Sequence, residues 1–189
     1  MAKTNSITLR AGHVIEYNGK IMVVLKHEIM QMQQRSGTIQ LDLRDIRSGN
    51  KDSIRFKTGE MIDRVQLEQA ESQYLFSDGD NFTFMNDQTF EQISIPREIL
   101  GEQAAFLQEG MKVSIETYEG EPLNVTLPST ITAEIVETEP VVKGQTAASS
   151  YKPAILDNGV RVMVPPHIGA GTRVVVKTED GSYVERAKD

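Results

Sequence analysis

The sequence predicts an all-β protein made of three small β-barrels in tandem, with one short helix. Apolar and polar residues alternate with a period of two in segments such as residues 40–46, a pattern typical of half-buried strands. Turn dipeptides that contain glycine end these short runs again and again. Strands this short, separated by turns this frequent, favour sandwiches or small barrels.

Turn signals justify the strands in order along the chain. Residues 13–17 and 20–25 flank Asn18-Gly19, which tolerates positive φ at both central positions of a type I′ hairpin. Residues 40–46 end at Ser48-Gly49-Asn50. The later strand–turn–strand signals lie at Asp78-Gly79, Glu119-Gly120, Asn158-Gly159 and Asp180-Gly181.

One segment has a helical pattern. Pro96 suits the first turn of a helix, and Leu100, Ala104 and Leu107 lie on one face at helical spacing. Gly110 is a typical helix end. Residues 96–110 therefore predict the one helix.

Charge divides the chain into three parts that match three barrels of about 60 residues. The 189 residues carry a net charge of −7, from 20 Lys and Arg against 27 Asp and Glu. Residues 1–65 carry +4, residues 66–129 carry −10 and residues 130–189 carry −1. We expect domain boundaries at these positions. The negative total argues against a general DNA binder, and the positive first part is the one suited to phosphate contacts.

Several classes of function are not supported. The absence of cysteine excludes disulfides, zinc–thiolate sites and thiol nucleophiles. His13, His27 and His167 are scattered and do not have metal-ligand spacing. No phosphate-binding loop or catalytic triad is present. The polar N-terminus and the lack of long apolar runs indicate neither secretion nor a membrane. We expect a cytoplasmic protein that is not an enzyme and uses no metal or cofactor.

Three separated groups of residues make the chain similar to the bacterial elongation factor P family, over essentially its whole length. Lys152-Pro153-Ala154 opens a spaced signature in the last third, and residues 82–86 match the family's middle domain. Arg10-Ala11-Gly12 matches the first domain. The other matching positions are Arg47-Ser48-Gly49, Lys51, Arg55, Phe56, Asp78-Gly79, residues 89–92, Gly159, Val162, Val164-Pro165, Ile168 and Gly171.

The resemblance implies a fold and a function. The fold would be a KOW/SH3-like barrel followed by two OB-fold barrels, in an L-shaped outline like that of a transfer RNA. The function would be that of a monomeric translation elongation factor, whose partners are the ribosome and peptidyl-tRNA. Such a factor binds between the peptidyl and exit sites and stimulates peptide-bond formation at stalling sequences such as consecutive prolines.

The family's reaching loop is altered here. In the family a hairpin loop of the first domain carries Lys or Arg within Pro-Gly-Lys-Gly or Pro-Gly-Arg-Gly, and that residue approaches the CCA end of peptidyl-tRNA. Residues 31–37 read Gln-Met-Gln-Gln-Arg-Ser-Gly instead. A gapless alignment puts Gln34 at the tip beside Gln33, and a shift by one residue puts Arg35 there. The alternative is a solvated loop without a function.

Modification of the tip is restricted by the sequence. No lysine lies between Lys26 and Lys51, so Arg35 is the only candidate for the family's tip modification. We expect an unmodified tip.

Other contacts follow from the resemblance or from charge. Tyr183 and Arg186 resemble a family pair that contacts tRNA or the small subunit. Gly144, Gln145 and Thr146 occupy the place of a codon-side loop, usually Gly-Asp-Thr-x-Gly, although a flexible linker is the alternative. On charge alone, the phosphate contacts expected in the first domain are Arg10, Lys51, Arg55 and Lys57.

Two other functions remain open. One is an OB/SH3-type RNA-binding or adaptor module that lacks the stimulating activity, and the other is a paralogue that acts on different stalling sequences. An RNA-binding module would show aromatic and basic residues alternating on one barrel face. The sequence lacks that alternation, because Phe82 and Phe84 lie in the acidic part.

Overall fold

The computed structural model describes residues 2–32, 35–141 and 150–188, with the backbone alone at 32, 35 and 36. Its strands form three antiparallel sheets, which confirms the all-β prediction. The chain divides into two compact units. The first unit comprises residues up to 70 together with 115–124, and the second comprises 71–114 together with 125 onward.

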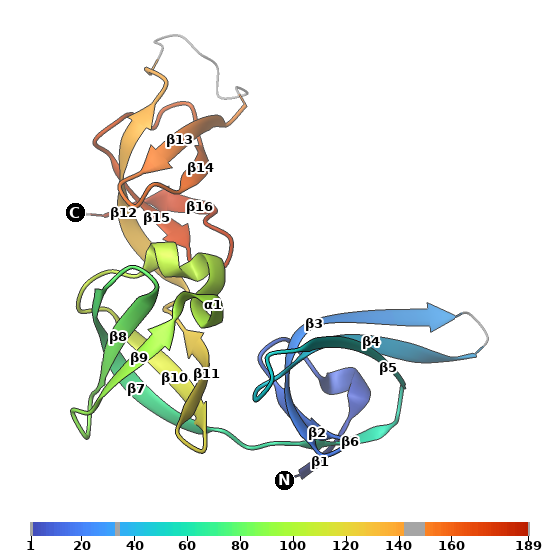
Figure 1. The fold of residues 1–189 in the computed structure, drawn as a ribbon. Helices are drawn as coiled ribbons and strands as arrows, with labels where there is room; N and C mark the ends of the chain where they lie inside the picture. Colours follow the sequence, from blue (N-terminus) through green and yellow to red (C-terminus); the bar gives the residue numbers. More distant parts are fainter. Residues whose placement is uncertain (1, 33–34, 142–149, 189) are drawn as a thin grey trace. The chain divides into compact units, whose positions relative to one another are not determined.

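The first unit is built on a six-stranded sheet in the order β1-β6-β2-β3-β4-β5. Figure 1 shows this sheet curling around a 3-10 turn, η1 (Ser6–Thr8), while β3 and β4 extend beyond the curl. The Ser6 hydroxyl donates to the Lys57 carbonyl at 2.8 Å and so fastens η1 to the sheet. The strands are β1 (Ala2–Asn5), β2 (Val14–Tyr17), β3 (Lys20–Met32), β4 (Arg35–Asp45), β5 (Lys51–Lys57) and β6 (Met61–Arg64).

The predicted hairpin at Asn18-Gly19 is confirmed. Tyr17 pairs with Lys20, and the φ angles of Asn18 and Gly19 are 51° and 73°. Both angles lie in the left-handed region that a type I′ turn requires.

The middle sheet has the order β11-β10-β7-β8-β9. The predicted helix is shorter than residues 96–110, because Gly101, with φ 61°, ends α1 (Arg97–Leu100) after one turn. A 3-10 segment, η2 (Gly101–Phe106), follows it and buries Ala104 and Phe106. The strands are β7 (Glu68–Ser77), β8 (Asn81–Asn86), β9 (Gln92–Pro96), β10 (Lys112–Tyr118) and β11 (Glu121–Thr126).

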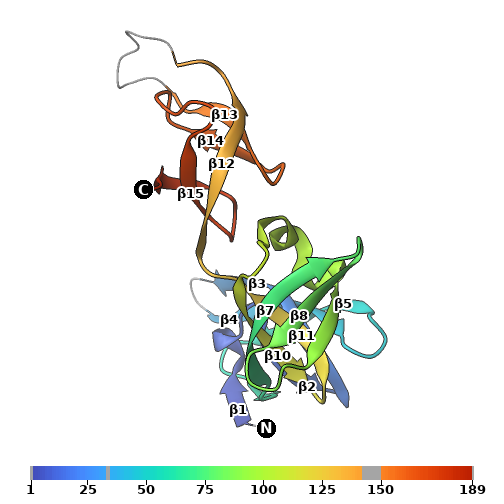
Figure 2. The same ribbon diagram turned by 90° about the vertical axis from the view of Figure 1, so that its left-hand side faces the viewer.

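The third sheet has the order β14-β13-β12-β15-β16. Figure 2 shows β12 between β13 and β15. The predicted turns at Asn158-Gly159 and Asp180-Gly181 connect neighbouring strands, as expected. The strands are β12 (Thr130–Thr138), β13 (Lys152–Leu156), β14 (Arg161–Val164), β15 (Arg173–Lys177) and β16 (Tyr183–Arg186).

The first unit has two apolar clusters because successive residues of β2 and β3 point to opposite faces. Ile15 and its partner Met22 belong to the cluster inside the curl. Val14 and its partner Val23 point outward, where Leu123 of β11 covers them. Beside this second cluster the Asn124 amide donates to the Gly12 carbonyl at 2.7 Å. The β10–β11 hairpin therefore completes the packing of the first sheet.

Candidate nucleic-acid interface

The β3–β4 hairpin carries the segment that was expected to form the tip. β3 continues to Met32 and β4 begins at Arg35, with these two residues paired across the hairpin. Strand structure thus extends into the range 31–37 that was expected to be a loop. Gln33 and Gln34 lie outside the described residues, so their contact with the CCA end stays a prediction.

Gly37 allows the two strands of this hairpin to approach each other closely. A Cβ atom at position 37 would lie 2.8 Å from the Met30 carbonyl oxygen. The Gly37 carbonyl accepts the Thr58 amide at 2.9 Å, which ties the hairpin to the turn after β5. Glycine here meets a steric need rather than a need for unusual φ.

Three of the expected phosphate contacts share one face of the edge strand β5. Lys51, Arg55 and Lys57 alternate with buried Phe56 and half-buried Ile54, so their side chains project away from the core. On β4 the partners of Lys51, Arg55 and Lys57 are Arg44, Gln40 and Thr38. The structure thus gathers basic groups on an exposed strand at the base of the hairpin.

We call Lys51, Arg55 and Lys57 the β5 basic face, and a chain of side-chain hydrogen bonds holds Arg55 in place on it. Arg55 Nη2 donates to Gln40 Oε1 at 3.3 Å, Gln40 Nε2 donates to Ser53 Oγ at 2.8 Å, and Ser53 Oγ donates to Asp42 at 2.8 Å. Arg55 is therefore held by a neutral amide, and its charge is not consumed by an ion pair. A preorganised guanidinium suits a phosphate oxygen. Gln40, Asp42 and Ser53 were missed at the sequence level, although their period-two spacing on β4 and β5 was a usable signal.

Arg10 lies in a different place, in the loop between η1 and β2. Its Nη1 donates to the carbonyls of Ile7 and Leu9 at 2.7 and 2.8 Å. The structure does not bring Arg10 to the β5 basic face, and part of its guanidinium stabilises the end of η1.

Tyr183 and Arg186 point to the same side of the third sheet. Residues three apart on a regular strand face opposite sides, but an irregularity in the β15–β16 register changes this. Tyr183 pairs with Val176 and Arg186 with Val174, and the register shifts between Val175 and Val176. Directly paired residues lie on one face, so Tyr183 and Arg186 face together.

The environment of Tyr183 is partly apolar. Its ring meets that of Tyr151 edge-on, with centroids 6.4 Å apart. Burial, together with the neighbouring Tyr151 and Glu185, raises the pKa of Tyr183 above its ordinary value. The phenol stays protonated at neutral pH and can donate a hydrogen bond. Gly144, Gln145 and Thr146 lie outside the described residues.

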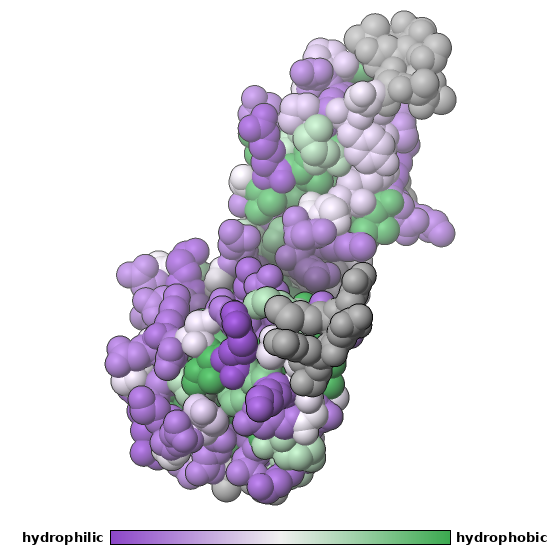
Figure 3. Space-filling model, turned by 90° about the vertical axis from the view of Figure 1, so that its right-hand side faces the viewer, coloured by the Kyte–Doolittle hydropathy of each residue, from purple (hydrophilic) through white to green (hydrophobic). Residues whose placement is uncertain are grey.

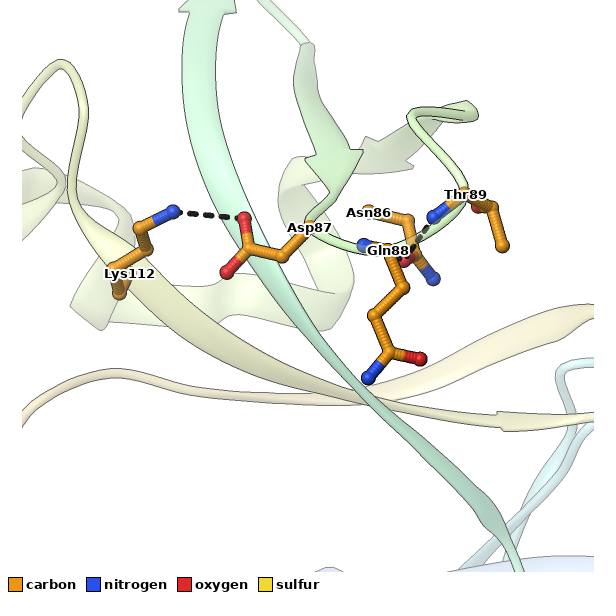
Figure 4. Close-up of polar contacts among 5 residues, drawn as sticks. All are labelled: Asn86, Asp87, Gln88, Thr89 and Lys112. Atoms are coloured by element: carbon orange, nitrogen blue, oxygen red, sulfur yellow. Dashed lines mark hydrogen bonds and ion pairs between the residues drawn. The ribbon is translucent and has the colours of Figure 1, made fainter.

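The acidic middle part, residues 66–129, contains two basic residues, and both have contacts within the second unit. Lys112 forms an ion pair with Asp87 at 2.8 Å, in the turn drawn in Figure 4. Arg97 lies over the Phe82 ring, 5.1 Å from its centroid, and donates to the Gly79 carbonyl. Lys112 is thus ion-paired, whereas Arg97 is exposed and keeps its positive charge.

The surface, the metal-ligating side chains and the helix lengths are the remaining features of the molecule that bear on function. The face in Figure 3 is largely hydrophilic, with small hydrophobic patches. Within residues 2–32, 35–141 and 150–188, no three His, Asp or Glu side chains are grouped to hold a metal ion. In the same ranges no helix has the length and apolarity needed to span a membrane.

Together these features define an all-β protein whose first unit carries a long hairpin and the β5 basic face. The residues match three family models in order: 5–62 match "Elongation factor P (EF-P) KOW-like domain", 67–125 "Elongation factor P (EF-P) OB domain" and 131–186 "Elongation factor P, C-terminal". The fold is therefore that of a translation factor with a KOW-like domain and OB-type barrels. The chain belongs to the elongation factor P family, and it is a translation elongation factor.

Relatives match over nearly the full chain. The chain is 52% identical to "Elongation factor P" of Rhodospirillum centenum, covering 99% of this chain and 100% of that one. It is 51% identical to "Elongation factor P" of Methylobacterium nodulans, with the same coverage. Among solved structures, "Eukaryotic translation initiation factor 5A from Methanococcus jannaschii" aligns with a TM-score of 0.45 and 17% identity, covering 67% of this chain and 92% of that chain.

Proposed function

We propose that this chain binds the ribosome between the peptidyl and exit sites, beside peptidyl-tRNA, and stimulates peptide-bond formation at stalls such as consecutive prolines. The observation that carries the proposal is the β3–β4 hairpin, which extends from the unit that holds the β5 basic face. The β5 basic face, at the base of the hairpin, suits contact with RNA phosphates. The hairpin itself is a narrow two-stranded arm, which suits a crowded reaction centre. Family membership supplies the reaction that such an arm would serve.

The proposed mechanism is positioning rather than chemistry. Proline is a poor nucleophile, and a prolyl peptide takes up geometries that react slowly. Ordering the tRNA end restores a reactive arrangement, and well-oriented reactants can gain about 7–11 kcal/mol over unordered ones. The factor then needs no catalytic group or cofactor and acts as a cytoplasmic monomer that is not an enzyme.

The tip would work without modification. Gln34 would contribute neutral hydrogen bonds to the CCA end, and Arg35 would contribute phosphate pairing and stacking. Mass spectrometry of the protein from its native host tests this point, because added mass on Arg35 would contradict an unmodified tip.

The decisive experiment is translation in vitro of a reporter with consecutive prolines. Purified wild type, Gln34→Ala and Arg35→Ala are compared with a no-factor control. We expect wild type to relieve the stall and one of the two variants to lose most of that effect. No relief by wild type rejects the proposal, and ribosome binding without relief favours the RNA-binding alternative. Equal relief by all three proteins rejects only the tip assignment.

A further inference from the structure

Three basic residues of the first unit, Arg10, His13 and Arg64, lie near one another where β2 begins and β6 ends. The Arg10 amide donates to His13 Nδ1 at 3.1 Å. The ladder to β3 continues through His13, whose carbonyl accepts the Val24 amide at 2.8 Å. His13 therefore lies on the same side as Ile15, two residues on, and Arg64 pairs directly with Ile15. Arg10 and Arg64 are exposed and His13 is half-buried.

Within the described part of the chain, the charges that act on His13 are positive. The charged groups that face His13 are Arg10, from the η1–β2 loop, and Arg64, from β6, and both are positive. Val24 of β3, which bonds to the His13 carbonyl, is uncharged, and so is Asn124 of β11, which bonds to the adjacent Gly12. Burial, followed by Arg64 and Arg10, holds the pKa of His13 below its ordinary value of 6.5. Like charges this close are unfavourable unless an anion joins them.

The available hydrogen-bonding groups are all donors. Because His13 Nδ1 accepts from Arg10, the neutral imidazole carries its proton on Nε2 and can donate there. Arg10 uses Nη1 for the carbonyls of Ile7 and Leu9, which fixes its guanidinium, and within the described residues Nε and Nη2 are left for another acceptor. Arg64 adds a second guanidinium. Such a set of donors matches the oxygens of a phosphate.

We infer that Arg10, His13 and Arg64 form a binding site for a backbone phosphate of RNA. The inference rests on the proposed function in one respect, that RNA is the polyanion the factor meets. RNA is favoured over a small anion because the same unit carries the β5 basic face, and an extended polyanion can contact separate groups of charges. The site adds Arg64 and His13 to the contacts expected from charge alone.

The first test measures affinity for a fluorescent 12-base-pair RNA duplex by anisotropy, at several salt concentrations. Arg64→Gln removes one proposed contact. Arg47→Gln is the matched control, since Arg47 is exposed in the same unit but lies in the turn after β4. We expect Arg64→Gln to weaken binding roughly tenfold and to lower the slope of log affinity against log salt by about 1. Equal behaviour of the two variants, with matching unfolding midpoints, overturns the site.

The second test follows the imidazole of His13 by NMR, with His13→Gln used to assign its signal. A bound phosphate stabilises the protonated ring, so RNA should raise the pH midpoint of this signal. No change with RNA, or a change with millimolar inorganic phosphate but not with RNA, overturns the inference. Failure in both tests while the proline reporter still responds rejects this site and leaves the proposed function standing. A reporter that does not respond to wild type rejects the proposed function instead.

Discussion

Replacing Gly37 by alanine tests the geometry of the reaching hairpin most directly. The φ of Gly37 is outside the left-handed region, so its backbone accepts any residue, but the new Cβ would lie 2.8 Å from the Met30 carbonyl oxygen. Relieving this overlap costs about 1–3 kcal/mol. Alanine also restricts the unfolded chain more than glycine does, which stabilises the folded state by about 0.4–1 kcal/mol. We expect the free energy of unfolding to fall by about 1–2 kcal/mol in total.

Gly169→Ala is the matched control, because Gly169 also has an ordinary φ and its nearest neighbour, Val141 Cγ2, is at a normal contact distance of 3.6 Å. The free energy of unfolding of Gly169→Ala should rise by up to about 1 kcal/mol. Urea unfolding gives both free energies, and hydrogen exchange gives the protection of the Thr58 amide, which bonds to the Gly37 carbonyl. If Gly37→Ala is as stable as Gly169→Ala and the Thr58 amide stays protected, the close-approach argument is wrong.

Two further predictions concern stability. Phe90 has φ 61° and is 69% exposed, so Phe90→Gly relieves backbone strain and should raise the free energy of unfolding by about 0.5–1 kcal/mol. The control is Phe76→Gly, at a 54% exposed strand position, which should lower the free energy of unfolding. Two changes of the same sign would contradict the strain at Phe90. Leu123→Ala should cost about 2–5 kcal/mol and should reduce amide protection at Val23 in the first sheet, because Leu123 covers Val23. If only β10 and β11 lose protection, the outward-facing cluster does not couple the β10–β11 hairpin to the first sheet.

Elements encoded by local rules could be predicted from the sequence. Asn18-Gly19 requires left-handed φ at two successive positions, and few structures other than a tight hairpin supply it. The predicted helix, residues 96–110, is longer than the observed one, because apolar spacing does not indicate that Gly101 turns the chain after Leu100. A glycine that can take a positive φ is itself a local stop signal, so Gly101 rather than Gly110 was the usable marker of the helix end.

The site was less accessible to sequence reasoning. The basic residues of β5 were found from charge, but the fixing of Arg55 by Gln40 depends on strand register. Arg10 carries the right charge yet lies elsewhere, since its partners are the carbonyls of its own loop. Tyr183 and Arg186 share a face only because of a register shift, which spacing alone does not reveal.

The outward-facing cluster of the first unit has a consequence for synthesis of the chain. Val14, Val23 and Val65 are translated early, but Leu123, which covers them, follows about 60 residues later. At a translation rate of about 5–20 residues per second, Leu123 is added about 3–12 s after Val65. During that interval an apolar surface is open to chaperones or to wrong partners. A chain that ends at residue 65 would keep that surface open permanently, so the amino-terminal barrel matures only after most of the next one has left the ribosome that makes it.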